Sequence, residues 1–303
     1  KWERESSGPV GRLSTEGLDK VFEEFSKAIG IGSNAEYLKE LFKKSYLEHS
    51  NLAKATRFLA NELFSTEGLV IIDGDDKNLK TLFAPYIKDE LIHQNSFRTV
   101  SKTINQLKNY TIQVNPREIN LFYIEDHLRE RIILENNIYK INNTEIQFSE
   151  VEILELLQNS PEKFSPNVIL RPLYQEVILP NLAYIGGGGE IAYWLELKNN
   201  FNSQKVTFPI LMLRNSFVVA TEKQIEKIDK LHLSWSELFL PQQELVHQKT
   251  KEISIFKIDF SEQKETLKQQ FSELLKIAAQ TDKSFIGAVK AQEVKQIKGL
   301  ENL

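Results

Sequence analysis

The first part of the chain carries apolar side chains at helical spacing. Over residues 15–65 they recur every three or four positions, as in Leu18, Val21, Phe22, Phe25 and Ile29. Gly30 ends this first pattern, and Asn34 and Asn51 stand where each can cap a further helix. The pattern therefore predicts a helical connecting region over residues 1–66.

From residue 67 the pattern changes to short apolar runs that alternate with helical segments. The runs lie at 69–72, 167–170, 183–185, 208–213 and 217–220. A continuous apolar run of this length is typical of a strand buried on both faces. Alternation of such strands with helices predicts a parallel α/β sheet. Because few strands are visible, we expect a partial Rossmann-like core over residues 67–220.

Residues 111–148 show a different strand pattern inside this core. The β-rich runs are short and lie at 111–114, 121–124, 131–134, 139–141 and 145–148. The pairs Asn136-Asn137 and Asn142-Asn143 are turn signals between them. These features predict a small antiparallel β patch, followed by a helix whose capping box is Ser149 with Glu152.

The chain from Thr221 onward has an almost continuous helical pattern. Leu267, Phe271, Leu274 and Ala278 repeat at 4-3-4 spacing, which is typical of a coiled-coil seam. Such a seam favours either an oligomer contact or an intramolecular helix contact. The predicted fold is therefore α/β: a helical connecting region, a partial Rossmann-like core with a β patch, and a helical coiled-coil region over 221–303.

Composition excludes several classes of function. The 303 residues include 38 Lys+Arg and 42 Asp+Glu, so the net charge of -4 argues against a general nucleic-acid binder. The chain has no cysteine, which excludes disulfides and thiolate metal sites within it. No apolar run approaches the ~20 residues of a membrane span, and the five histidines are too far apart in sequence to suggest a metal site. We expect a cytoplasmic protein with no membrane partner and no metal.

A run of four glycines, Gly186, Gly187, Gly188 and Gly189, lies between a predicted strand and a predicted helix. Glycines there let a ligand approach the backbone, and free N–H groups at a helix start favour an anion. The alternative is a tight turn that needs positive φ. Glu190, which follows, could hold an amine such as the α-amino group of an amino acid, or it could simply be a favourable residue for a helix start.

Further polar residues stand at the ends of predicted strands. Asn167, Arg171, Tyr174 and Gln175 follow one strand, and Arg214 and Asn215 follow another. Open α/β sheets bind ligands at this edge, and a guanidinium there can bind a carboxylate or phosphate. The alternative for each arginine is an ion pair with an acidic neighbour. Asp73 and Asp75 also end a predicted strand, where a solvated turn is favoured over metal or hydroxyl binding.

Taken together, these segments resemble one family. The stretch from Asn167 to Glu176, then Pro180, Ala183-Tyr184, the glycine run with Glu190, and Tyr193-Trp194 are similar to the signature of the bacillithiol biosynthesis cysteine-adding enzymes, the BshC family. The similarity covers essentially all 303 residues. The family's loop usually reads Gly-Pro-Gly-Glu where this chain has Gly187 to Glu190, and the family often has Pro where this chain has Leu213.

This resemblance implies a carbon–nitrogen ligase that joins L-cysteine to glucosaminyl-malate in the last step of bacillithiol synthesis. It also implies kinship with nucleotidylyltransferase-like folds, a homodimer formed through the C-terminal helices, and ATP or ADP as the nucleotide. The residues that we expect to bind substrate or nucleotide are Asn167, Arg171, Tyr174, Gln175, Tyr184, Gly186, Gly187, Gly188, Gly189, Glu190, Trp194, Arg214 and Asn215. No catalytic residue is assigned.

Family members begin with a Rossmann-like half that carries a Gly-Gln-Gln or Gly-His-Gln loop, which is absent here. We therefore expect a middle segment that is inactive by itself. The alternative function is a non-catalytic nucleotide- or sugar-binding dimerisation module. A dehydrogenase of the NAD type is disfavoured because the chain lacks the spacing G-x-G-x-x-G.

Overall fold

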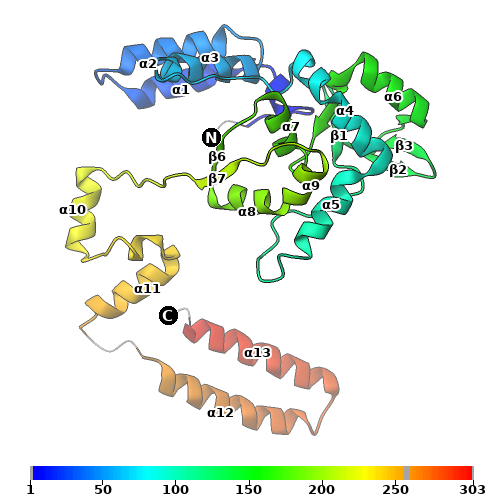
Figure 1. Ribbon diagram of the computed structural model, residues 1–303. Coiled ribbons are helices and arrows are strands. Elements are labelled where there is room, and N and C mark those ends of the chain that lie inside the picture. The colour runs from blue at the N-terminus through cyan, green and yellow to red at the C-terminus, as the bar shows by residue number, and fades with distance from the viewer. Residues whose placement is uncertain (1–2, 256–258, 302–303) are drawn as a thin grey trace. The chain divides into compact units, whose positions relative to one another are not determined.

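A computed structural model of the chain describes residues 3–255 and 259–301 (Figure 1). The chain divides into two compact units, Lys1–Asn215 and Ser216–Leu303. The sequence pattern had suggested a boundary between residues 220 and 221. Each unit is described by itself below.

Unit 1 begins with a group of helices: α1 (Leu18–Ile29), α2 (Ala35–Phe42), a π-helical turn over Lys43–Leu47, and α3 (Leu52–Phe64), preceded by a 3-10 turn at Val10–Arg12. The predicted helices are confirmed, but the side chain of Asn34 makes no capping hydrogen bond at the start of α2. Gly30 ends α1 with a φ of 63°. Asn51 caps α3, because its side chain accepts a hydrogen bond from the backbone N–H of Lys54 at 2.9 Å. The ring of Phe42 holds α2 against α1.

The largest sheet is antiparallel and has the strand order β4-β3-β2-β1-β5. Its strands are β1 (Leu121–Glu125), β2 (Leu128–Glu135), β3 (Ile138–Ile141), β4 (Gln147–Phe148) and β5 (Phe164–Pro166). Asn136 and Asn137 both have positive φ and form the β2–β3 turn, as predicted. The predicted β patch is thus confirmed, except that residues 111–114 form no strand.

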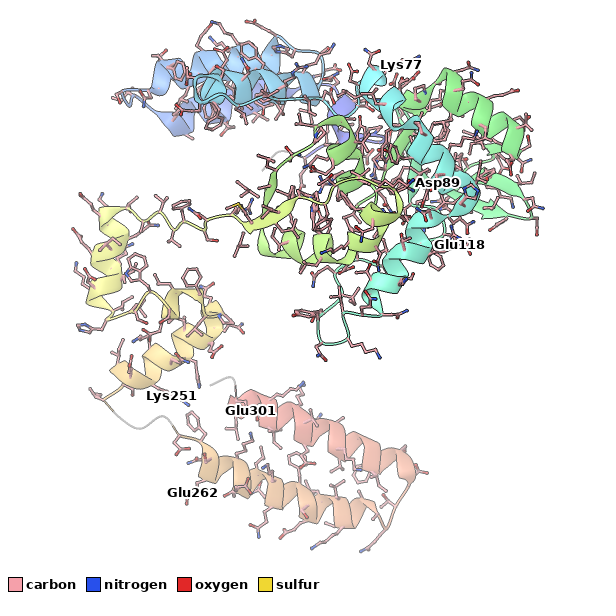
Figure 2. All side chains as sticks on the ribbon, viewed as in Figure 1. Lys77, Asp89, Glu118, Lys251, Glu262 and Glu301 are labelled. Atoms are coloured by element: carbon pink, nitrogen blue, oxygen red, sulfur yellow. The ribbon has the colours of Figure 1, made fainter. Side chains whose placement is uncertain are left out.

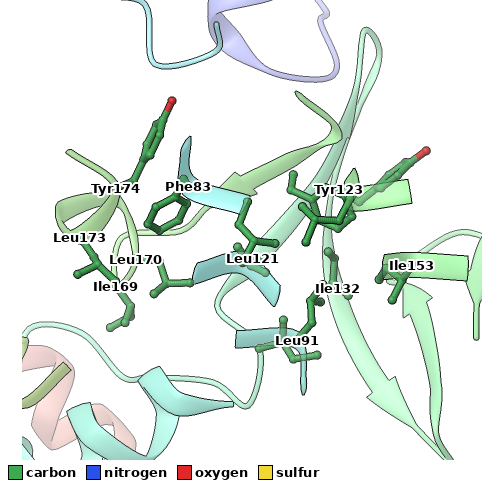
Figure 3. Packing of buried hydrophobic residues seen from close by; sticks show 14 of the residues in the cluster. Phe83, Leu91, Leu121, Tyr123, Ile132, Ile153, Ile169, Leu170, Leu173 and Tyr174 are labelled. Atoms are coloured by element: carbon green, nitrogen blue, oxygen red, sulfur yellow. The ribbon is translucent and has the colours of Figure 1, made fainter. Parts of the chain in front are cut away.

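Helices pack against this sheet and enclose the main core. They are α4 (Lys77–His93), α5 (Asn95–Ile104) and α6 (Glu150–Asn159), and α6 starts at the predicted capping box. Short 3-10 turns lie at Ser65–Glu67 and Pro161–Lys163. Figure 3 shows Phe83 and Leu91 from α4 against Leu121 and Ile132 from the sheet, all four almost fully buried. This core fixes the elements that carry the candidate site.

The second sheet is a parallel pair, β6 (Ala183–Gly186) and β7 (Ile210–Leu213). The helices beside it are α7 (Arg171–Ile178), α8 (Gly188–Glu196) and α9 (Lys198–Ser203). These two strands confirm only part of the predicted parallel sheet. Both sheets together make unit 1 a mixed α/β structure.

Three predicted strands are wrong: 69–72, 167–170 and 217–220 form no strand in the described chain. Residues 69–72 and 217–219 are largely exposed, with Val70 at 73% and Val219 at 92%. At 167–170 the side chain of Asn167 accepts the N–H groups of Ile169 and Leu170 and turns the chain into α7. An apolar run forms a strand only where a neighbouring strand pairs with its backbone. Among these runs only Asn167 makes such a contact in the described chain, through its N–H to the Asn120 carbonyl at 3.0 Å.

Unit 2 is helical, with α10 (Glu222–Lys230), a 3-10 turn at Glu237–Phe239, α11 (Gln242–Ile253), α12 (Ser261–Ala278) and α13 (Lys283–Glu301). The last two helices form an antiparallel hairpin. Lys264, near the start of α12, forms an ion pair with Glu301 at the end of α13, and Figure 2 shows Glu262 and Glu301 at the same end of the hairpin.

The predicted coiled-coil seam serves this intramolecular contact. Phe271 and Ala278 are buried against Val289 of α13, and Leu267 packs on them. Leu274 is 46% exposed, so it lies outside this intramolecular contact, and Leu275 faces inward in its place. Within the described chain, no helix is long and apolar enough to cross a membrane.

Candidate functional site

The glycine run joins the parallel sheet to a helix in a very short connection. Strand β6 ends at Gly186 and α8 begins at Gly188, so Gly187 alone links them. Gly187 is extended, with φ -68° and ψ 165°. None of the four glycines has a positive φ. The interpretation of this run as a turn that requires positive φ is therefore wrong.

The chain's own packing explains only the first part of the run. A Cβ added at Gly186 would lie 2.7 Å from the ring of Tyr184, which no real Cβ tolerates. A Cβ at Gly187 would lie 3.4 Å from the guanidinium of Arg214. At Gly188 and Gly189 it would meet nothing within 4 Å. The last two glycines thus leave the start of α8 open to an approaching molecule.

Glu190 closes the first turn of α8 with its carboxylate. One oxygen accepts the backbone N–H of Gly187 at 2.9 Å, and the other accepts the hydroxyl of Tyr184 at 2.9 Å. The Gly187 hydrogen bond, then that of Tyr184, holds the pKa of Glu190 below its usual value, and Arg171 and Arg214 add to the shift. Glu190 therefore serves the helix start, and it remains ionised beside two guanidinium groups.

Neither arginine forms a salt bridge with a carboxylate among the described residues, although both attract the Glu190 carboxylate. Arg171 donates to the Tyr193 hydroxyl at 2.6 Å and to the side-chain oxygen of Gln175 at 3.2 Å. Arg214 donates its backbone N–H to the Gly186 carbonyl at 2.9 Å, while its exposed side chain has no hydrogen bond or ion pair within the described chain. The alternative of an ion pair is thus not found for either arginine.

These groups together can bind an anion. The N–H groups of the first residues of a helix have no partner in the helix, and those of Gly188 and Gly189 have no acceptor among the described residues. The helix dipole adds partial positive charge at the same point. Two guanidinium groups and free N–H donors around one helix start suit a carboxylate or a phosphate.

Other predicted site residues have structural roles. Asn167 accepts the N–H groups of Ile169 and Leu170 in the turn before α7, and buried Tyr174 donates its hydroxyl to the Gly74 carbonyl at 2.9 Å. Trp194 is fully buried and stacks on Tyr184, with 4.1 Å between ring centroids. Asn215 is exposed after β7. Asn167, Tyr174 and Trp194 thus make contacts within the chain, and their predicted role in binding stays a prediction.

Tyr193, which is not among the predicted binding residues, also contacts the candidate site. Its hydroxyl accepts a hydrogen bond from Arg171 and links α7 to α8. The signal was its position three residues after Glu190, on the same side of the helix. As for metals, no group of three or more His, Asp or Glu within the described residues could hold an ion.

Comparison with known families gives two matches. Residues 1–215 match the model described as bacillithiol biosynthesis BshC, N-terminal Rossmann-like domain. Residues 217–303 match the model described as the C-terminal coiled-coil domain of the same proteins. The two matched ranges agree with the two units of the structure.

Curated proteins named "Putative cysteine ligase BshC" are similar over the whole chain. One from Flavobacterium johnsoniae is 63% identical over 303 residues, and one from Flavobacterium psychrophilum is 66% identical over 302 residues. One from Cytophaga hutchinsonii is 37% identical over 304 residues. Each alignment covers 100% of this chain but only 56–57% of the relative, so the chain spans just over half the length of these proteins.

Proposed function

Because the chain belongs to the BshC family of bacillithiol biosynthesis, we propose that it is part of a ligase that adds L-cysteine to glucosaminyl-malate. The observation that supports this role within the chain is the start of α8, where Gly188 and Gly189 are open and Arg214 is free of a partner in the described structure. The relatives named as cysteine ligases suggest the reaction.

We propose that this site binds a carboxylate or phosphate of a substrate. The N–H group of Gly189 would donate to one oxygen, and the guanidinium of Arg214 would donate to a second. Arg171 would add positive charge to the site, and its hydrogen bonds to Tyr193 and Gln175 hold the guanidinium in a fixed orientation. Such charge-assisted hydrogen bonds are the strongest that a protein offers to an anion.

The proposed reaction joins the carboxylate carbon of cysteine to the amine nitrogen of glucosaminyl-malate. A carboxylate oxygen must leave as the amide bond forms, and the amine must lose a proton. We propose ATP as the cosubstrate, which would supply a phosphoryl or adenylyl group that makes this oxygen a good leaving group. The start of α8 and Arg214 fit one phosphate of ATP or ADP.

Glu190 would serve as an orienting group. Each carboxylate oxygen can accept two hydrogen bonds, and the structure gives each oxygen one. The remaining capacity suits an ammonium or sugar hydroxyls, as the sequence suggested. The hydrogen bonds to Gly187 and Tyr184 would hold the carboxylate in place for that contact.

We also propose that the ligase is a homodimer formed through the C-terminal helices. The buried residues between α12 and α13 pack against each other within one chain. However, Leu274, Ile277 and Val294 are 46%, 59% and 53% exposed on this hairpin. Apolar side chains in this number on one hairpin are suited to a second copy.

The experiment is a reaction of the full-length protein with L-cysteine, glucosaminyl-malate and ATP, followed by mass spectrometry. We expect bacillithiol in the complete mixture and none when any one component is omitted. Absence of product from well-folded protein would contradict the proposal. The 303-residue chain, assayed in parallel, tests the prediction that it is inactive by itself.

One substitution tests the site in the same assay. Arg214→Ala should lower kcat/KM by roughly 10- to 150-fold, because a hydrogen bond to a charged group contributes about 1.5–3 kcal/mol. Arg98→Ala is the matched control, since Arg98 is exposed on α5 and its side chain has no partner in the described structure. Equal activity of the two variants would remove Arg214 from the site.

A further inference from the structure

Unit 1 contains a polar cavity that is separate from the glycine run. It has a volume of about 190 Å³ and lies where the turn at Val10–Arg12, the start of α3 and the loop before α4 meet. Its polar lining comes from Arg12, Asn51, Asp73, Asp75, Lys80 and Ser165. Cavities for drug-sized ligands are larger than this, so a ligand of this cavity would be small.

A network of charges forms one wall. Asp75 accepts from Nε of Arg12 at 2.5 Å and is also paired with Lys80. Lys80 is 3% exposed and donates to the Glu162 carbonyl at 3.1 Å. Burial alone would raise the pKa of Asp75, but the hydrogen bonds from Arg12 and Lys80 outweigh it and lower the pKa. The interpretation of Asp75 as part of a solvated turn is therefore wrong.

This network leaves donors unused. The ammonium of Lys80 has three N–H donors and contacts two acceptors, Asp75 and the Glu162 carbonyl. The guanidinium of Arg12 has five N–H donors and makes four hydrogen bonds, one of them a long contact of 3.4 Å to exposed Asp126. Each cation therefore has one N–H left for an anionic group, and on Arg12 this N–H belongs to Nη1.

Asp73 provides the opposite charge. One of its oxygens accepts the backbone N–H of Asp75 at 2.9 Å, and no cation in the described structure pairs with it. The cavity thus combines two cations that have unused donors with one carboxylate that lacks a cation. Its four charged groups sum to zero, which disfavours a metal ion or a multiply charged anion. A small ligand that carries both charges satisfies both sides.

We propose that this cavity binds a free α-amino acid. The α-carboxylate would accept from Arg12 and Lys80, and the α-ammonium would donate to Asp73. Helix α7 contacts both sites, because Tyr174 donates to the Gly74 carbonyl beside the cavity and Arg171 lies beside the glycine run. The choice of L-cysteine as the first probe rests on the proposed function.

The test is calorimetric titration of the full-length protein with L-cysteine and L-serine. Two further probes each lack one charge: cysteamine has no carboxylate, and 3-mercaptopropionate has no ammonium. We expect L-cysteine to bind and both of these analogues to bind at least tenfold more weakly. Equal binding of either analogue would overturn the proposal, as would no binding of either amino acid.

The matching variants are Asp73→Asn and Asp126→Asn. Asparagine at 73 keeps the oxygen that accepts the Asp75 N–H, so the loop should fold, which circular dichroism and a denaturant titration verify. We expect Asp73→Asn to weaken L-cysteine binding at least tenfold. Asp126→Asn should change it less than twofold, because Asp126 is 84% exposed and contacts Arg12 from outside. Unchanged binding by Asp73→Asn would overturn the proposal.

The test of the cavity and the test of the ligase reaction can fail independently of each other. If L-cysteine binds through Asp73 but no bacillithiol forms, the cavity is supported and the proposed function fails. If bacillithiol forms and Asp73→Asn leaves the KM for cysteine unchanged, the proposed function stands and the cavity proposal is refuted.

Discussion

Gly189→Ala separates the two possible reasons for a glycine at the start of α8. Gly189 is the second residue of the helix, its φ is not positive, and an added Cβ would meet no atom within 4 Å. The chain by itself therefore does not need glycine at this position. If a ligand approaches the N–H of Gly189, the methyl group would meet that ligand and not the protein.

The two effects have opposite signs. Alanine in place of glycine, at a conformation that alanine can adopt, stabilises a protein by about 0.4–1 kcal/mol, chiefly by restricting the unfolded chain. The same methyl group should displace an anion from the helix start and remove one charge-assisted hydrogen bond. Such a bond contributes roughly 1.5–3 kcal/mol, which corresponds to about a 10- to 150-fold loss of kcat/KM if it is made in the transition state.

Urea unfolding and steady-state kinetics of the full-length protein measure both effects. Gly188→Pro is the matched control, because proline is favourable at the first position of a helix and the related family loop has Pro at this place. We expect Gly189→Ala to be at least as stable as wild type but markedly less active, and Gly188→Pro to be active. A destabilised Gly189→Ala variant would refute the claim that the chain itself does not need glycine at this position. A stable and fully active variant would refute the claim that a ligand approaches the N–H of Gly189.

Three further outcomes follow from the structure. Glu190→Gln should lower the free energy of unfolding by about 0.5–2 kcal/mol. Because the native pKa of Glu190 is lowered, this difference from wild type should hold above about pH 5 and shrink as the pH falls through the native pKa. A difference that grows in acid would contradict this expectation. Phe271→Ala should destabilise the α12–α13 hairpin by about 3–5 kcal/mol, and hydrogen exchange should show faster exchange in α12 but not in α4. Leu274→Lys should shift the protein toward monomer in sedimentation, whereas a dimer that persists would exclude that face.

Local signals in the sequence predicted local structure well. Asn51 caps α3, Ser149 and Glu152 form a capping box, and the Asn136-Asn137 pair makes the β2–β3 turn. Each of these features depends on atoms within a few residues of one another, so the sequence contains all the information that they need. The helices and the antiparallel hairpins were predictable for this reason.

Features that depend on distant partners were not predictable. Residues 69–72 have the composition of a buried strand, but no described strand pairs with them and Val70 is 73% exposed. The seam in α12 also depends on a distant partner. Packing against α13 determines that Leu275 and not Leu274 points inward.

The candidate site shows both cases. The glycine run, Glu190 and Arg214 were predictable as a group because they stand at strand ends and at a helix start, whereas Arg171 begins α7 and follows a predicted strand that is absent. The burial of Trp194 and the hydrogen bond from Arg171 to Tyr193 depend on how α7, α8 and β6 pack together. Neither could be read from the order of residues alone.

The most direct test of the central claim is the bacillithiol content of cells. A bacterium that makes bacillithiol, with its own cysteine-adding gene deleted, would receive the full-length gene of this protein, and its thiols would be labelled and quantified by mass spectrometry. We predict that bacillithiol returns with the wild-type gene and falls strongly with Arg214→Ala. Accumulation of glucosaminyl-malate without bacillithiol, despite normal expression of the wild-type protein, would contradict the account.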